Sequence, residues 1–329
     1  VACFHREGAW LSRVEACAPV TEFPIAGFTR PRTLARAAEF VRWCRSHRIT
    51  VIQSCDFYAN TFALPAAAVA GVALRVGSRR ELAPDKSPAQ IAVQRQAYRF
   101  AHVIAANSAA AADRLRREGV PQRRIRVIPN GVSLDRFSFA RSIRPIRTIL
   151  TVANLRTEKA HEVLFEAIAR VAPRHPSLRL RVAGDGPRAA ELRALAASIG
   201  VADRVAFLGH REDVGALLQE ADAFVLPSRS EAFPNSVVEA MAAGLPIIAC
   251  AVGGLLELVD LHRTGLLVPV DDAAALADAI DSLASDPARA FALGEAARAE
   301  IVRRYSFDRM VGTFEDLYVS SHRTSSKAA

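Results

Sequence analysis

Short apolar runs rich in β-branched residues alternate along most of the chain with segments whose apolar residues recur every three or four positions. Continuous runs of this length indicate buried strands, and the three- to four-residue period indicates amphipathic helices. In the first half the predicted strands are 49–54, 72–78, 102–108 and 124–132. The predicted helices are 32–47 before the first of these strands, and 89–100 and 110–119 between later ones. The pattern therefore predicts a parallel sheet covered by helices in the first half of the chain.

A second series of the same kind follows a polar, aperiodic segment at 138–148, which we interpret as a linker. Its predicted strands, each followed by a helical pattern, are 148–155, 178–186, 204–209, 223–228 and 246–252. Two such series predict an α/β fold of two doubly wound, parallel-sheet, Rossmann-like domains that face a cleft, with ligands at the carboxyl ends of the strands. We expect domains at 1–140 and 146–304, a closing amphipathic helix at 305–320 and a disordered tail at 321–329.

The composition is that of a globular protein, with 51% apolar and 23% charged residues. Five widely spaced cysteines without a C-x-x-C pair argue against a disulfide framework or a zinc site and favour a reducing, cytoplasmic location. The sequence shows no acidic D-x-D pattern suited to a metal ion. The longest apolar stretch, 62–74, contains Pro65 and meets Arg75, so we expect a buried helix followed by a strand rather than a membrane span.

Positive charge is concentrated in the first half of the chain. Residues 1–145 hold 23 Lys and Arg against 10 Asp and Glu, whereas residues 146–329 hold 20 against 24. Two interpretations fit: an Arg-rich solvated surface, or a face that meets an anionic partner such as the inner face of the plasma membrane or a phosphorylated acceptor. We do not expect nucleic acid as a partner, because the sequence carries none of the common nucleic-acid-binding motifs.

Two glutamates stand eight positions apart in the stretch SEAFPNSVVEA, Glu231 before a predicted helix and Glu239 within its first turn or just after it. Asn235 or Ser236 is the expected N-cap. Free N–H groups at a helix start attract phosphate, and a carboxylate accepts hydrogen bonds from a diol. The pattern predicts a sugar at Glu231, a pyrophosphate at Asn235 and Ser236, and a ribose at Glu239. The alternative is a loop charge and a carboxylate that stabilises the helix dipole.

This stretch resembles the E-x7-E element of the GT-B-fold retaining glycosyltransferases known as glycosyl transferases group 1, with Ala232 in place of the usual Gly. Further stretches that are similar to the family follow in its order: 127–137, 152–167, 182–192, 207–214, 251–259 and 264–272. The resemblance implies that the donor also contacts Phe233 and Pro234. It implies a closing helix that crosses back to the first domain.

The resemblance implies a catalytic role for Glu231 and for a basic pair after the first strand of the second domain. Lys159 matches the family's lysine, and Arg156 is the candidate for the arginine, whose usual position holds Asn154. The glycines at 184 and 186 resemble a dinucleotide fingerprint, but the next predicted strand ends without the required acid. We therefore assign Gly184 and Gly186 to the backbone approach of the donor nucleotide and not to a nicotinamide cofactor.

The first domain departs from the family in several places. The family's opening strand and Gly-Gly turn have no counterpart before Val1, so we expect this domain to fold poorly without them. Where relatives carry strand-end histidines, the chain has Gln53 and Cys55. Asp56 is the nearest polar candidate on the acceptor side, and capping of the following helix is its alternative role. The pair Arg79–Arg80 is expected to grip an acceptor phosphate, with solvated surface arginines as the alternative.

The resemblance implies transfer of a hexose-type sugar, with retention, from a nucleoside diphosphate sugar to a lipid-linked or saccharide acceptor in bacterial cell-surface glycan, lipopolysaccharide or glycolipid synthesis. It implies no metal and no cofactor beyond the nucleotide sugar itself. Two other functions stay open at this point. One is a GT-B-fold nucleotide-sugar epimerase, and the other is an inactive remnant that binds nucleotide sugars.

Overall fold

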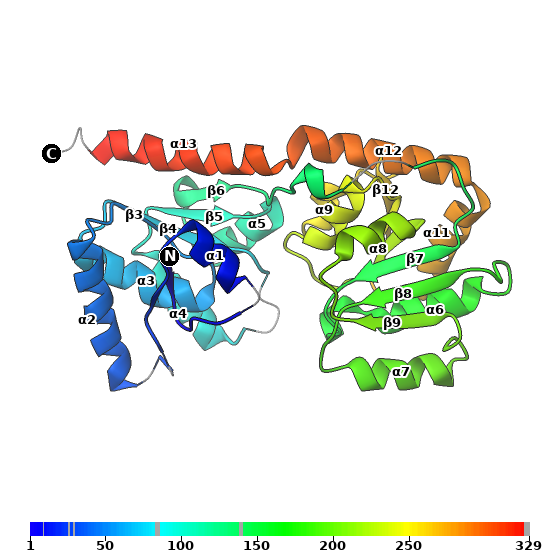
Figure 1. The fold of residues 1–329 in the computed structure, drawn as a ribbon, viewed down its shortest axis with the longest axis horizontal. Coiled ribbons are helices and arrows are strands. Elements are labelled where there is room, and N and C mark those ends of the chain that lie inside the picture. Colours follow the sequence, from blue (N-terminus) through cyan, green and yellow to red (C-terminus); the bar gives the residue numbers. More distant parts are fainter. Residues whose placement is uncertain (9, 26, 29, 83–85, 138–140, 326–329) are drawn as a thin grey trace.

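The computed structural model describes residues 1–8, 10–25, 27–28, 30–82, 86–137 and 141–325. It has two α/β lobes, and the last two long helices lie along one side of the molecule, one over each lobe (Figure 1). Both lobes are built on parallel sheets with helices packed against them. The α/β fold of two facing parallel-sheet domains predicted from the alternating pattern is therefore confirmed.

The first lobe contains a four-stranded parallel sheet in the order β3-β4-β5-β6. These strands are β3 (Val51–Gln53), β4 (Leu74–Arg79), β5 (Val103–Ala106) and β6 (Ile125–Val127). The helices are α2 (Pro31–Ser46), α3 (Phe57–Ala70), α4 (Pro88–Tyr98) and α5 (Ala109–Arg117). A separate two-stranded sheet, β1 (Ala2–Cys3) and β2 (Thr21–Glu22), flanks α1 (Leu11–Cys17). The predicted elements of this half are all present, with strands shorter than predicted.

The second lobe contains a six-stranded parallel sheet in the order β12-β11-β10-β7-β8-β9. The strands are β7 (Thr148–Val152), β8 (Arg179–Ala183), β9 (Val205–Gly209), β10 (Ala223–Leu226), β11 (Ile247–Cys250) and β12 (Gly265–Val268). The helices are α6 (His161–Val171), α7 (Ala189–Ser198), α8 (Val214–Glu220), α9 (Asn235–Ala242), α10 (Leu255–Leu258), α11 (Ala273–Ser285) and α12 (Pro287–Arg304). The chain runs outward from β7 to β9 and then returns to β10 beside β7. Such a reversal of strand order is where open α/β sheets bind ligands.

Alternating residues of the central strands fill two separate cores on the two faces of this sheet. Ile149 and Val225 pack with helices α6 and α11 on one face. Leu150 and Phe224 pack with α8, α9 and α12 on the other. Because successive side chains of a strand point to opposite faces, the period of two explains the division. Both faces are sealed, so the polar ligand-facing groups gather at the strand ends.

The chain crosses between the lobes twice, and the two crossings are bonded to each other. The N–H of Val132 donates to the Tyr305 carbonyl at 2.9 Å, and the N–H of Phe307 donates to the Val132 carbonyl at 3.0 Å. A Cβ at Gly131 would lie 2.6 Å from the Ser306 carbonyl oxygen, so this approach requires glycine. Helix α13 (Phe307–Ser325) then lies on the first lobe. Its side chains pack on the core of the first sheet, through Met310, Phe314, Leu317 and Tyr318.

The closing helix thus crosses back to the first lobe, as expected. The prediction of disorder was wrong for residues 321–325, because α13 continues to Ser325, while 326–329 lie outside the described residues. Of the linker predicted at 138–148, residues 138–140 also lie outside them, and 141–147 form no helix or strand.

The apolar stretch 62–74 forms the end of α3 and the start of β4, with Leu64 and Ala67 fully buried, as expected. Pro65 sits inside α3 without ending it. No helix in the described ranges is both long enough and apolar enough to cross a membrane.

Arg79 is a buried residue that links several segments of the first lobe through hydrogen bonds. Its side chain is 1% exposed. It donates to the Glu81 carbonyl at 2.8 Å, to Gln94 at 2.6 Å and to the Glu118 carboxylate at 2.8 Å. The expected grip of Arg79 on an acceptor phosphate is therefore wrong, because burial and three internal partners occupy the guanidinium. Its neighbour Arg80 is exposed.

We predict that Arg79→Ala lowers the free energy of unfolding by about 3–5 kcal/mol, since it removes the buried partner of the Glu118 carboxylate and leaves only Arg114 paired with it. Arg80→Ala is the matched control and should change it by less than about 0.5 kcal/mol. Urea denaturation of the two variants beside the parent chain measures both. Equal effects at the two positions would contradict the structural role of Arg79.

Candidate active site

The loops that follow β7, β8, β9 and β10 surround a hollow of about 430 Å³ in the second lobe, here called the donor-side hollow. Parallel strands bring their carboxyl ends to one edge of the sheet, so loops distant in sequence meet there. The residues that line the hollow are Val152, Ala153, Asn154, Lys159, Ala183, Gly184, His210, Arg211, Glu231, Phe233, Pro234, Asn235 and Ser236. Most residues predicted to bind the donor therefore lie together.

An ion pair between Lys159 and Glu231 forms the charged centre of the donor-side hollow. The Lys159 Nζ lies 2.6 Å from a Glu231 carboxylate oxygen, and the side chains are only 20% and 8% exposed. The two residues follow β7 and β10, which are neighbours in the sheet. Their contact spans the point where the strand order reverses. A second link ties the same loops together, because the Arg229 N–H donates to the Glu158 carbonyl at 2.8 Å.

Helix α9 starts at the edge of the hollow without a capping side chain. Its N-cap is Pro234, with no side-chain capping bond. The expectation that Asn235 or Ser236 caps the helix was wrong, because both residues already lie inside it. An uncapped start leaves backbone N–H groups available to an anionic ligand.

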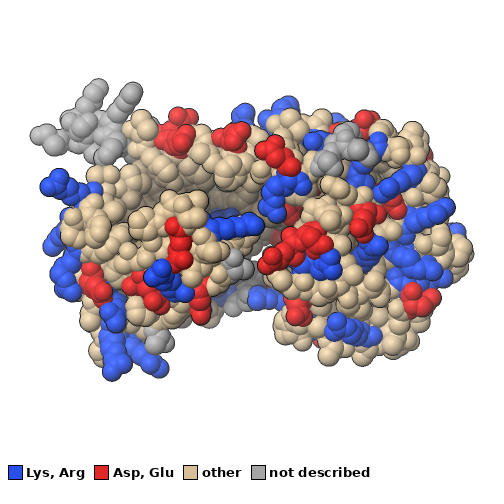
Figure 2. All heavy atoms as spheres, in the orientation of Figure 1, with Lys and Arg blue, Asp and Glu red and all other residues tan. Residues whose placement is uncertain are grey.

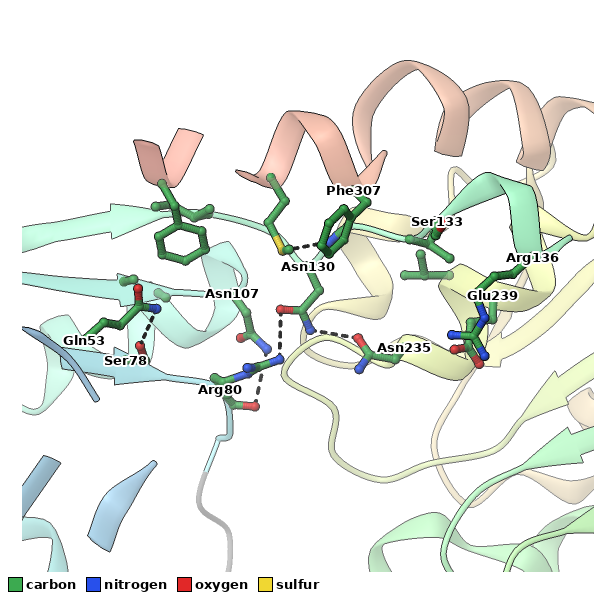
Figure 3. Close-up of a pocket in the computed structure, with 18 of the residues that line it drawn as sticks. Gln53, Ser78, Arg80, Asn107, Asn130, Ser133, Arg136, Asn235, Glu239 and Phe307 are labelled. Atoms are coloured by element: carbon green, nitrogen blue, oxygen red, sulfur yellow. Dashed lines mark hydrogen bonds between the residues drawn. The ribbon is translucent and has the colours of Figure 1, made fainter. Parts of the chain in front are cut away.

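Glu239 lies in the second turn of α9, one turn beyond Asn235, and not in the first turn. It lines the cleft between the lobes, where the side chain of Arg136 lies beside it (Figure 3). Burial raises the pKa of the Glu239 carboxyl, and the positive charge of Arg136 opposes part of that rise. An ionised Glu239 is therefore poorly solvated until hydroxyl groups of a ligand reach it.

The two predicted donor-binding glycines have different surroundings. Gly184 lines the hollow at φ +144°, and a Cβ there would lie 1.9 Å from the Ala153 carbonyl oxygen. At Gly186 a Cβ would lie 2.6 Å from the Leu155 carbonyl oxygen, and this glycine does not line the hollow. Both glycines let the loops after β7 and β8 pack closely. For Gly186 the structure shows a role in loop packing, and its contact with the donor stays a prediction.

The predicted basic pair is not assembled as expected. Arg156 is exposed and does not line the donor-side hollow, whereas Asn154 does. The second cation at the hollow is Arg211, which follows β9 with His210. Neither residue was predicted as a site residue from the sequence, although both directly follow a predicted strand and so fall at the ligand-binding edge of the sheet.

A second hollow of about 430 Å³, the interdomain cleft, lies between the lobes. Figure 2 shows the molecule hollowed here, with Lys, Arg, Asp and Glu side chains around the opening. The Asn130 amide donates to the Asn235 side chain at 2.8 Å across the cleft, and Arg80 donates to Asn130 at 3.4 Å (Figure 3). Asn235 lines both hollows, so they meet at the start of α9.

The first lobe contributes polar residues to the cleft from the ends of its strands, namely Gln53, Ser78, Arg80 and Asn107. Asp56 is not among them. It is the N-cap of α3, and its carboxylate accepts a hydrogen bond from the Ala59 N–H at 2.7 Å. The structure shows the capping role that was the alternative for Asp56, and an acceptor-side role for it stays a prediction. Within the described ranges, no group of three or more His, Cys, Asp or Glu residues is arranged to hold a metal ion.

The two facing parallel-sheet domains, the cleft between them and the helix that crosses back define the GT-B architecture. The sequence profile "Glycosyl transferases group 1" matches residues 140–300, and the profile "Glycosyltransferase Family 4" matches residues 1–136. The chain belongs to the glycosyl transferases of group 1.

Among curated relatives, an exopolysaccharide phosphotransferase of Streptomyces coelicolor is 36% identical over 197 residues, which are 59% of this chain and 21% of the relative. A glycogen synthase of Mycobacterium tuberculosis is 35% identical over 205 residues, 60% of this chain and 49% of the relative. The matches thus span half or less of these relatives. Anabaena HepE, solved with UDP-glucose, superposes with a TM-score of 0.87 at 23% identity, over 97% of this chain and 91% of that one.

The pKa of Glu239 leads to a stability prediction. A folded-state pKa above the unfolded value means that the ionised carboxyl destabilises the folded chain, and this penalty grows as the pH rises through and beyond about 4.3. Glu239→Gln should therefore raise the urea midpoint at pH 7, with a gain that disappears below about pH 4. The same change at exposed Glu295 is the control. A loss of stability at pH 7 in Glu239→Gln would contradict this account.

Proposed function

We propose that this chain is a retaining hexosyltransferase, which moves a sugar from a nucleoside diphosphate sugar to a lipid-linked or saccharide acceptor in bacterial cell-surface glycan synthesis. The observation that carries the proposal is the Lys159–Glu231 pair beside the uncapped start of α9. Two further findings support it. HepE, of the same fold, was solved with UDP-glucose, and the two curated relatives bear the names of polysaccharide enzymes.

In this proposal the diphosphate of the donor lies between Lys159 and the first N–H groups of α9. The leaving nucleoside diphosphate gains negative charge as its bond to the sugar breaks. A fixed cation and a helix start stabilise that charge more strongly than they stabilise the bound donor, which lowers the barrier. When the diphosphate pairs with the Lys159 ammonium in place of Glu231, the Glu231 carboxylate becomes free to accept hydrogen bonds from sugar hydroxyls.

The ribose of the donor is proposed to reach Glu239, one helical turn from Asn235. Its two hydroxyls would donate to the buried carboxylate and replace water that the cleft excludes. The base is proposed to extend toward His210 and Arg211, the lining residues after β9. The donor would then follow the ligand-binding edge of the sheet on both sides of α9.

The acceptor is proposed to lie in the interdomain cleft, with a phosphate or hydroxyl groups against Arg80 and Asn130. Among the described residues that line the two hollows, Glu231 and Glu239 are the only carboxylates. Since this proposal assigns Glu231 to the sugar hydroxyls and Glu239 to the ribose, neither carboxylate is left to attack the anomeric carbon, and we propose attack from the side of the leaving group. The acceptor oxygen bonds to the anomeric carbon, the bond to the diphosphate breaks, and the acceptor proton passes to a phosphate oxygen.

We propose that no metal ion takes part, because Lys159 and the start of α9 supply positive charge at the diphosphate. Transfer that continues in excess EDTA would support this, and strict dependence on an added divalent ion would contradict it. Release of an epimerised nucleotide sugar without any acceptor would instead identify an epimerase.

Lys159→Ala should lower kcat by about 10²–10³-fold, because its charge acts mainly on the leaving group, while the Kd for a nucleoside diphosphate rises less. Arg156→Ala is the matched control and should keep a kcat near the parent value, since Arg156 does not line the hollow. Steady-state transfer assays and calorimetry measure the two quantities, with a denaturation curve to confirm folding. A raised KM at unchanged kcat in Lys159→Ala would refute the leaving-group role.

A further inference from the structure

The carboxylate of Glu257, on α10 of the second lobe, contacts the start of helix α5 in the first lobe. It accepts hydrogen bonds from the N–H of Ala109 at 2.8 Å and the N–H of Ala110 at 2.9 Å, each through a separate oxygen. Nearly 150 residues separate the partners in sequence, 148 for the first bond. This is a direct bond between the lobes, outside the two hollows described above.

The contact completes the N-terminus of α5. Ser108 is the N-cap, and its hydroxyl accepts from the Ala111 N–H at 3.0 Å. The first three N–H groups of the helix are thus satisfied, one within the lobe and two by the other lobe. A carboxylate at this position also interacts favourably with the helix dipole. If the lobes separate, water must replace Glu257 at two N–H groups.

The segment that carries Glu257 also touches the backbone of the candidate active site. The Gly254 N–H donates to the Glu231 carbonyl at 3.0 Å. Gly253, at φ +48°, is so close that a Cβ would lie 2.0 Å from the same carbonyl oxygen and 3.1 Å from Leu82 of the first lobe. The loop between β11 and α10 is therefore packed between Glu231 and the first lobe.

We propose that Glu257 is a positioning residue that holds the two lobes at the separation where acceptor and donor react, and that it couples this closure to the position of Glu231. The proposal rests on the transfer function proposed above. The interlobe bonds of Glu257 and of Asn130 are polar and partly exposed. Such bonds exchange readily with water, so the lobes can part for substrate entry and product release.

The two sides of the contact allow matched variants. Glu257→Gln keeps the size of the side chain but removes its charge and one acceptor oxygen. Ala109→Pro removes one donor at the first helical position, where proline is well tolerated. Ser108 is already extended, at φ −158° and ψ 162°, as a residue before proline must be. Glu295→Gln, on the exposed surface of α12, is the control for loss of a carboxylate.

We expect Glu257→Gln and Ala109→Pro each to lower kcat by about tenfold and to leave the Kd of a nucleoside diphosphate within about twofold, because the donor-side hollow is intact. The double variant should be little worse than either single one, since both remove the same contact. Small-angle X-ray scattering of the nucleotide-bound chain should show a larger radius of gyration in both variants. Glu295→Gln should match the parent chain in all three measurements.

An unchanged radius of gyration in both variants would overturn the proposal, whatever happens to turnover. So would additive losses in the double variant, because they would show independent roles for Glu257 and Ala109. Scattering does not depend on transfer activity, so failure of the proposed function appears separately, as a parent chain that transfers no sugar and yet opens when Glu257 is changed.

Discussion

The ion pair of Lys159 with Glu231 is the interaction on which the arrangement of this protein depends. It joins the loops after β7 and β10 at the place where the strand order of the second sheet reverses. Every other feature of the donor-side hollow is built around that junction: the close loop packing at Gly184, the uncapped start of α9 and the Gly253–Gly254 backbone against Glu231. Two sealed cores hold the sheet beneath it, so the pair sits on a rigid base.

Several groups at the site are in energetically unfavourable states in the ligand-free chain, and a bound ligand would lower that cost. Lys159 and Glu231 neutralise each other in a mostly buried setting, where each loses hydration. Burial raises the pKa of Glu239, and α9 begins without a side-chain cap. Ala160, next to Lys159, adopts φ +48°, a conformation that non-glycine residues rarely take. A donor that carries a diphosphate and a diol would supply partners for the Lys159–Glu231 pair, for the Glu239 carboxylate and for the N–H groups at the start of α9.

The alternation of apolar runs and helical patterns was enough to predict the order of the elements, because parallel α/β sheets repeat one simple unit. It also placed Glu231 in the loop after β10, and the family resemblance placed Lys159 in the loop after β7, where the structure has both. The pattern could not predict which of two neighbouring residues faces the cleft. Arg79 points inward to Glu118, whereas Arg80 is exposed.

Contacts between distant segments were equally hidden from the sequence. Nothing near Glu257 indicates that its partners are the N–H groups of Ala109 and Ala110, because backbone donors leave no mark in a sequence. Gly186 resembled a ligand-binding glycine, but the backbone that it must avoid belongs to Leu155, on a neighbouring loop. A requirement of this kind depends on which loops meet in the folded chain, so it cannot be predicted from the local sequence.

A crystal structure with a bound nucleoside diphosphate tests the central claim most directly. The account predicts that a phosphate oxygen replaces the Glu231 carboxylate at the Lys159 ammonium, that the N–H groups at the start of α9 face the diphosphate, and that the ribose hydroxyls meet Glu239. A nucleotide bound elsewhere, for example against Arg80 with the Lys159–Glu231 pair still closed, would contradict it.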